Sequence, residues 1–216
     1  MLMNADLTDG NLKMSMPQHS ENLSSAEYYD KNALVYYNQT VNLDLSTLYK
    51  PFLELIPESG KILDAGCGSG RDSLYFKNKG FSVVSLDASE EMVNLAAQLI
   101  GQEVLYMSFT DIVFEDELDG IWACASLLHI PQDNMDDVFR RLSRALKRNG
   151  ILYTSFKYGD RERKSGDRAF NDYDEEKLAH LINHHKDLKI VKSWLTEDVR
   201  TDRKNEFWLN ALLRKI

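Results

Sequence analysis

The sequence KILDAGCGSGRDSLY, which runs from Lys61 to Tyr75, decides the fold of this chain. Its first part, Ile62 to Ala65, is a short apolar run typical of a buried strand. Alternate positions after that run are glycines: Gly66, Gly68 and Gly70. A segment with helical spacing follows from about Arg71. The stretch therefore predicts a strand, a glycine loop and a helix.

The glycines of this loop predict a ligand cradle. Without a Cβ at positions 66 and 68, the chain can turn sharply and a ligand can lie against bare backbone. The following helix would direct its free N–H groups and its positive dipole end at that ligand. A glycine loop considered alone has a second reading, a tight turn that binds nothing.

The neighbouring residues favour the ligand reading. Asp64 lies at the end of the first strand, and a second apolar strand, Phe81 to Leu86, ends in Asp87. A carboxylate at the tip of the second strand is where a doubly wound sheet holds the hydroxyls of a ribose. The spacing G-x-G-x-G, with Arg71 next, matches neither the nicotinamide-binding nor the Walker pattern. We expect a ligand that carries a ribose and need not carry phosphates.

These residues resemble a family, the class I S-adenosylmethionine (SAM) dependent methyltransferases. LDAGCGSG, from Leu63 to Gly70, is similar to their first motif, and Asp87 matches the acidic residue after their second strand. GSGRDSLYF and the expected C-terminal hairpin look similar to the small tellurite-resistance-type methyltransferases, which act on small anionic acceptors. The resemblance covers about residues 28–216 and implies an α/β, Rossmann-like fold. It implies seven mostly parallel strands in the order 3-2-1-4-5-7-6, the last one antiparallel.

The resemblance also implies a cofactor, SAM, and its product, S-adenosylhomocysteine (SAH). In this interpretation Asp87 takes the ribose hydroxyls, Asp111 takes the adenine beside Thr110, and Asp64 reaches the methionine amino group. Asp111 could instead be an ordinary turn residue, and Arg71 could face the cofactor carboxylate or form a structural ion pair. The other residues expected at the cofactor are Tyr29, Tyr37, Gly66, Cys67, Gly68, Gly70, Ala88, Met92, Ala125 and Ser126.

Two segments are expected to cover the ligand. Residues 24–58 predict an N-terminal helical cap, in which Tyr29 and Tyr37 cover the cofactor or simply pack. Residues 158–172 are polar, glycine-bearing and locally basic, and we expect a structureless substrate lid there. Its Arg161 and Arg168 would contact an anionic acceptor.

His129 is the candidate catalytic residue. It follows the predicted fourth strand, Gly120 to Ser126, at the edge where doubly wound sheets gather their chemistry. Methyl transfer from a sulfonium is an in-line displacement that mainly needs its partners aligned. A base is needed only if the acceptor loses a proton, so His129 either supplies that base or organises its loop.

Composition bounds the remaining possibilities. The 216 residues suit a loose tail at 1–23 and one domain at 24–216. The sequence shows neither a membrane-length apolar run nor a signal peptide, so we expect a cytoplasmic protein. A net charge of −8 disfavours nucleic-acid partners. Two cysteines, and a His180 and His184 pair without the glutamate of a zinc motif, predict no metal site.

The sequence thus predicts a SAM-dependent methyltransferase that acts on a small, anionic acceptor. Two alternatives stay open: a protein that binds SAM or SAH without turnover, and a methyltransferase of protein or RNA. Formation of SAH from SAM and small acceptors would distinguish an enzyme from a protein that only binds SAM or SAH. Binding of RNA that weakens steeply with salt would favour an RNA methyltransferase. The acceptor atom and the oligomeric state are open at this point.

Overall fold

The computed structural model describes residues 23–166, 168–200, 203 and 205–216. The predicted tail at 1–23 lies outside these residues except for Leu23, where the first helix begins. The strands are β1 (Lys61–Ala65), β2 (Ser82–Asp87), β3 (Leu105–Tyr106), β4 (Leu118–Ala123), β5 (Leu146–Lys157), β6 (Glu162–Ser165), β7 (Arg168–Asn171), β8 (Leu188–Glu197) and β9 (Phe207–Lys215). The α-helices are α1 (Leu23–Thr40), α2 (Ser46–Leu53), α3 (Arg71–Asn78), α4 (Glu90–Ile100), α5 (Gln132–Ala145) and α6 (Glu175–His184). Two short 3-10 helices complete the fold, η1 (Phe109–Asp111) and η2 (Leu127–His129).

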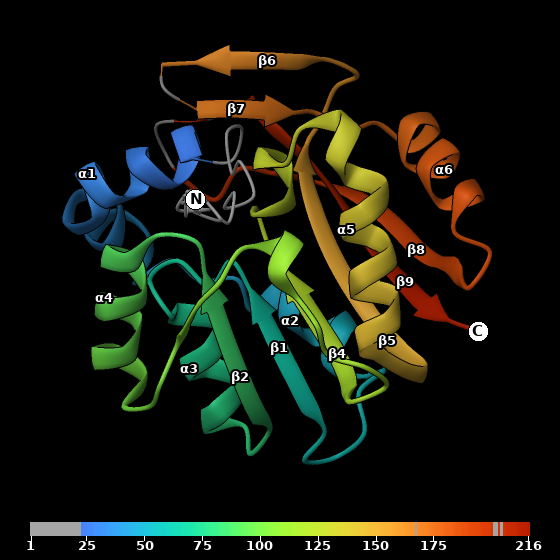
Figure 1. The fold of residues 1–216 in the computed structure, drawn as a ribbon, viewed down its shortest axis with the longest axis horizontal. Coiled ribbons are helices and arrows are strands. Elements are labelled where there is room, and N and C mark those ends of the chain that lie inside the picture. Colours follow the sequence, from blue (N-terminus) through green and yellow to red (C-terminus); the bar gives the residue numbers. More distant parts are fainter. Residues whose placement is uncertain (1–22, 167, 201–202, 204) are drawn as a thin grey trace, which may run out of the picture.

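A seven-stranded sheet in the order β3-β2-β1-β4-β5-β9-β8 forms the centre of the molecule (Figure 1). Strands β1 to β5 pair in parallel, whereas β9 is antiparallel to both of its neighbours, β5 and β8. This is the strand order that the resemblance implied, with the hairpin of β6 and β7 added between β5 and α6. The predicted Rossmann-like methyltransferase fold is confirmed.

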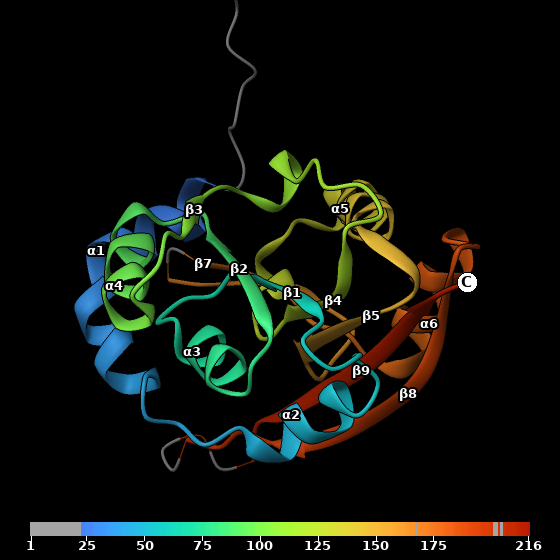
Figure 2. The ribbon, with the colours of Figure 1, turned by 90° about the horizontal axis from the view of Figure 1, so that it is seen from below.

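The alternation of apolar residues along each strand assigns the two faces of the sheet. Ile62 and Trp122 point to one face, where they pack with Phe52 of α2 and Phe76 of α3. Their neighbours along the strands point to the other face, which α5 and α6 cover. Figure 2 shows α2 lying along β9 at one side of the sheet. Because successive side chains of a strand alternate in direction, the near-continuous apolar strands fill both layers of core.

The end of α5 does not coincide with the cap signal in the sequence. Asn149 and Gly150 are a pair typical of a helix C-terminus, but α5 ends at Ala145 and β5 begins at once. The register shifts between Leu118 and Gly120 of β4, so residues 147–150 form an irregularity within β5. Asn149 has a φ of 69°, a left-handed conformation that Asn tolerates in bulges as well as in helix caps. The cap signal therefore marked a bulge.

The segment 158–172 is also more ordered than expected. Strands β6 and β7 pair as an antiparallel hairpin from Glu162 opposite Asn171 to Ser165 opposite Arg168. All of β6 is exposed, so the strand has no apolar alternation that could have predicted it. The hairpin and α1 lie on the same side of the sheet, beyond the carboxyl ends of the parallel strands (Figure 1).

Candidate functional site

The loop between β1 and α3 requires glycine at two positions. Gly66 has a φ of 76°, and a Cβ on it would lie 2.5 Å from the Cβ of Ser126. Gly68 has a φ of 52° and faces the ring of Tyr36, 3.5 Å from where its Cβ would be. The N–H of Gly66 donates to the carbonyl of Leu86 at 2.9 Å, which ties the loop to β2. Because these residues have no Cβ of their own, a ligand can approach the backbone of the loop closely.

Gly70 has a different role from the other two glycines. Its φ is 79°, and a Cβ on it would lie 3.0 Å from atoms of both Ala96 and Ile100 in α4. It therefore allows α4 to pack closely against the start of α3. Gly70 does not line the cavity described below, although the sequence predicted cofactor contact for it.

Asp87, at the end of β2, joins the glycine loop to the start of α4. Its Oδ2 accepts a hydrogen bond from the N–H of Gly68 at 2.8 Å, and its Oδ1 accepts one from the N–H of Ser89 at 3.0 Å. Burial raises the pKa of Asp87, and these N–H donors act against that increase. Each carboxylate oxygen can accept a further hydrogen bond. A pair of ribose hydroxyls would be suitable donors.

A cavity runs over the glycine loop and along the carboxyl ends of β1, β2, β4 and β5. Twelve of the residues predicted for the site line it: Tyr29, Gly66, Cys67, Gly68, Arg71, Asp87, Ala88, Met92, Ala125, Ser126, His129 and Arg168. Six do not line it: Tyr37, Asp64, Gly70, Thr110, Asp111 and Arg161.

Helix α1 closes the cavity with two tyrosines. Tyr29 and Tyr36 are seven residues apart, so they lie on one helix face, and their ring centroids are 4.9 Å apart. Tyr37 is the next residue along the helix, and its side chain therefore points away from that face. Tyr36, rather than the predicted Tyr37, lines the cavity, and its seven-residue spacing from Tyr29 is the sequence signal that identifies it.

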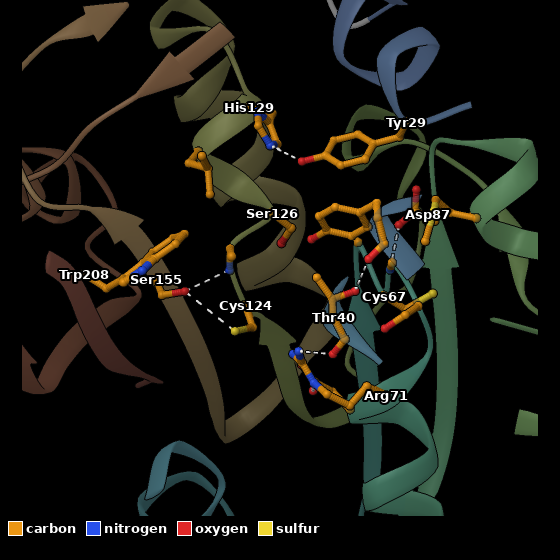
Figure 3. A pocket seen from close by; sticks show the side chains of 18 of the residues that line it. Tyr29, Thr40, Cys67, Arg71, Asp87, Cys124, Ser126, His129, Ser155 and Trp208 are labelled. Carbon is orange, nitrogen blue, oxygen red and sulfur yellow. Dashed lines mark hydrogen bonds and ion pairs between the residues drawn. The ribbon is translucent and has the colours of Figure 1, made fainter. Parts of the chain in front are cut away.

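The hydrogen bonds of His129 fix its tautomer. Its Nδ1 lies 2.8 Å from the carbonyl oxygen of Ala169, and its Nε2 lies 2.8 Å from the hydroxyl of Tyr29 (Figure 3). A carbonyl can only accept, so Nδ1 carries the proton and Nε2 accepts from the Tyr29 O–H. Burial lowers the pKa of His129 to about 4, and burial also raises the pKa of Tyr29. Near neutral pH the pair is therefore an uncharged imidazole and a phenol.

The residues after β3 bind one another outside the cavity. Asp111 is exposed, and its Oδ2 accepts hydrogen bonds from the hydroxyl of Ser108 at 2.5 Å and from its N–H at 3.2 Å. The hydroxyls of Thr110 and Ser108 are 2.8 Å apart. Ser108 and Phe109 line the cavity in their place. This arrangement matches the alternative in which Asp111 is a turn residue.

Asp64 and Arg71 are engaged in structural contacts. Asp64 is buried and accepts a hydrogen bond from the hydroxyl of Ser73 at 2.5 Å, and burial raises its pKa. Arg71 pairs with Asp72 through Nε at 2.6 Å, and its Nη1 donates to the carbonyl of Thr40 at 3.1 Å. Of the two roles considered for Arg71, the ion pair is present, while its side chain also borders the cavity.

The far end of the cavity lies beyond β4 and contains residues that the sequence did not reveal. Ser155 accepts a hydrogen bond from the N–H of Ala125 at 2.8 Å and lies beside Cys124. Trp208 reaches this end from β9 (Figure 3), and Asn210 of the same strand also lines the cavity. They arrive there only because β9 pairs antiparallel with β5, a register that no sequence motif specifies. We call this part of the cavity the acceptor end.

The hairpin separates the two arginines that were predicted to contact the acceptor. Arg168 lines the cavity, and its guanidinium carbon lies 4.5 Å from the ring centroid of Tyr28 and 5.0 Å from that of Phe170. Arg161 is 86% exposed, has Asp160 within 3.6 Å, and lies outside the cavity.

The strand order, with the glycine loop after β1 and the carboxylate after β2, defines a class of fold, the Rossmann-like methyltransferase fold. The family model described as "Methyltransferase domain" matches residues 62–150. YqeM of Bacillus subtilis, a protein named as a methyltransferase, is 33% identical over 132 residues. The match covers 56% of this chain and 52% of that protein. The chain thus spans about half the length of this relative. Phosphoethanolamine N-methyltransferase of Plasmodium falciparum is 24% identical over 204 residues, covering 88% of this chain and 76% of that protein.

Solved structures show the same fold. The 1,6-didemethyltoxoflavin-N1-methyltransferase of Burkholderia thailandensis, solved with 1,6-didemethyltoxoflavin and SAH, superposes with a TM-score of 0.75 at 21% identity, covering 99% of this chain and 93% of that one. A TehB-like SAM-dependent methyltransferase of Corynebacterium glutamicum gives a TM-score of 0.62 at 19% identity, covering 90% and 98%. The chain is thus similar in sequence and in fold to the class I SAM-dependent methyltransferases. None of the helices in the described part of the chain has the length and hydropathy that a bilayer crossing requires.

Proposed function

We propose that this protein transfers a methyl group from SAM to a small acceptor. The observation that carries the proposal is the cavity in which the open backbone of Gly66 and Gly68 lies beside the carboxylate of Asp87. In this reaction a lone pair of the acceptor forms a bond to the methyl carbon. The carbon–sulfur bond breaks, its electron pair stays on sulfur, and SAH is released. The protein mainly has to align acceptor and sulfonium in line.

The residues at the cavity suit an adenosyl cofactor. Asp87 keeps lone pairs free for the ribose hydroxyls after its two backbone hydrogen bonds. Ser108 and Phe109 provide the wall for the adenine, in the place first expected for Asp111. Ala125 and the glycine loop would lie against the methionine part, where a larger side chain would obstruct it.

In this proposal His129 acts on the acceptor through Tyr29. The Nε2 lone pair of His129 already accepts the Tyr29 hydroxyl, so it is not free to meet an acceptor directly. An acceptor proton would pass to the Tyr29 oxygen while the Tyr29 proton passes to His129 Nε2. The same hydrogen bond holds α1 against η2 and closes the cavity, so the pair also excludes water.

The size and charge of the cavity walls favour a small, anionic acceptor. The β6–β7 hairpin and α1 both border the cavity, which limits the space beside the methyl position. Arg168 places a cation on that wall, as an anionic acceptor would require. The toxoflavin-precursor and phosphoethanolamine enzymes named above act on small molecules, which supports this choice.

Calorimetry with SAH and SAM tests the cofactor site. Asp87→Asn should weaken SAH binding at least about tenfold, or roughly 1.4 kcal/mol, because an amide replaces one acceptor oxygen with a donor. Asp133→Asn, an exposed carboxylate on α5, is the matched control and should bind as the wild type does. Turnover is then measured as SAH formed from SAM with a panel of small acceptors. A wild-type protein that binds neither compound, or an Asp87→Asn variant that binds SAH equally well, contradicts the proposal.

A further inference from the structure

A second cavity adjoins the first near the end of β5, and the two share part of their lining. Residues from the end of β5, from both hairpin strands and from the start of β9 line it, and we call it the vestibule. The residues that line both cavities are Lys157, Arg168, Phe170 and Arg203. Three of these four shared residues are cations. The lining that the two cavities share is therefore cationic, in a chain whose net charge is −8.

The three shared cations differ in the carboxylate partners that the described residues give them. Lys157 is paired with Asp198 at 2.9 Å and also with Glu206. In contrast, no salt bridge involves Arg168 or Arg203 within the part of the chain that the structure describes. Among the described residues, acids therefore compensate Lys157, and none forms an ion pair with either arginine that the two cavities share.

Arg168 is the most suggestive of these cations. Its Nε atom is buried and has no hydrogen-bond partner among the described residues. A buried donor without a partner costs free energy, so such an atom calls for a ligand or an explanation. The rings of Tyr28 and Phe170 hold the guanidinium at 4.5 Å and 5.0 Å, and they contribute no hydrogen-bond acceptor to its N–H donors.

Arg163 lies beside Arg168 on the hairpin. Its guanidinium carbon is 4.6 Å from the ring centroid of Phe170, the ring that Arg168 also contacts. Asp172 neutralises Arg163 through hydrogen bonds of 2.6 Å and 3.2 Å. Asp172 thus compensates the charge of Arg163, whereas Arg168, which also bonds the side chain of Tyr29, keeps a buried Nε without a partner among the described residues.

We propose that the vestibule binds the anionic group of the methyl acceptor, a phosphate or a carboxylate, and that Arg168 holds it. Because both cavities share Arg168 as wall, one ligand can have its anion in the vestibule and its nucleophilic atom at the acceptor end. The acceptor is then an elongated small molecule with the anion at one end and the methylated atom at the other. This inference rests on the proposed function and adds to it where the acceptor binds.

The experiment measures anion binding directly in the full-length protein saturated with SAH. Inorganic phosphate and malonate are titrated separately by calorimetry into the wild type, Arg168→Gln and Lys164→Gln. Lys164 is exposed on β6 and lines neither cavity, so its variant removes the same charge from the same hairpin. We expect anion binding to weaken at least tenfold in Arg168→Gln and less than twofold in Lys164→Gln, with SAH affinity within threefold in both. The anion that binds more tightly identifies the acceptor group as phosphate or carboxylate.

Three results would overturn the inference. The first is a wild-type protein that binds SAH but neither anion, and the second is equal anion affinity in the two variants. The third is a loss of SAH affinity in Arg168→Gln as large as the loss of anion affinity, which would make Arg168 a clamp between Tyr28 and the hairpin. Failure of the wild type to bind SAH at all would instead contradict the proposed function, so the two failures are distinguishable.

Discussion

The two ring nitrogens of His129 are both used by the fold, and this has a consequence for stability. In the unfolded chain the imidazole titrates near its ordinary value of 6.5, whereas burial lowers the pKa of the folded residue to about 4. Between these values the unfolded state binds a proton that the folded state does not bind. The free energy of unfolding must therefore rise with pH across this window. Above about pH 6.5 neither state binds the proton, and the free energy of unfolding no longer depends on this residue's titration.

We predict that this residue alone lowers the free energy of unfolding by about 2 kcal/mol between pH 7.5 and pH 5. Urea unfolding of the wild type and of His129→Asn at both pH values measures the effect as a difference between the two proteins. His180→Asn, an exposed histidine on α6, should retain the wild-type dependence. If His129→Asn keeps the full pH dependence, the imidazole is not held neutral by the fold.

The relay through Tyr29 makes a second prediction at this scale. For an acceptor that loses a proton, Tyr29→Phe and His129→Asn should each lower kcat by about 100-fold, because each breaks the same proton path. The double variant should lose little more than either single one, since residues acting as a unit are not additive. Steady-state kinetics with a saturating acceptor measures this, and Tyr106→Phe, 65% exposed, is the control. Effects that multiply in the double variant would show that the two residues act independently.

Among the elements, the loop from β1 to α3 was the easiest to predict. The elements that pack against this loop, and the β6–β7 hairpin, were the hardest. Alternating glycines after an apolar strand specify the turn locally, so the sequence was sufficient to predict that Gly66 and Gly68 form a tight loop at the end of β1. The sequence was insufficient to predict the packing role of Gly70, because its neighbour Ala96 belongs to another helix, α4. The same limit applies to the hairpin, because the exposed β6 gives no apolar alternation.

The two reasons for glycine in that loop can be separated by experiment. Gly66→Ala combines a left-handed φ of 76° with a contact of 2.5 Å to Ser126, whereas Gly80→Ala has a φ of 89° and nothing within 4 Å. The control should lose about 1 kcal/mol from backbone strain alone, and Gly66→Ala should lose about 2 kcal/mol more. Urea unfolding of both variants gives the values. Equal losses would mean that the Ser126 side chain moves aside without cost.

For the whole molecule, the strand order could be predicted because it follows from alternating strands and helices and from the family resemblance. The acceptor end could not, since it combines β5, the hairpin and β9. Trp208 and Asn210 stand more than fifty residues from Ser155 in the chain and meet it only through the antiparallel register of β9. Local patterns thus predicted the half of the cavity that lies over the glycine loop, and long-range strand pairing determined the other half.

This division predicts how a ligand stabilises the molecule as a whole. SAH would contact the loop after β1, the end of β2, the turn after β4 and helix α1, so it links elements that are distant in sequence. At 100 times its Kd, SAH should raise the free energy of unfolding by about 2.7 kcal/mol. For a chain of this size that corresponds to an increase in Tm of about 5 to 11 °C. Scanning calorimetry with and without SAH measures the shift. Asp87→Asn at the same SAH concentration should show less than half of it, whereas Asp133→Asn should show all of it, and an equal shift in both variants would place the bound ligand away from β2.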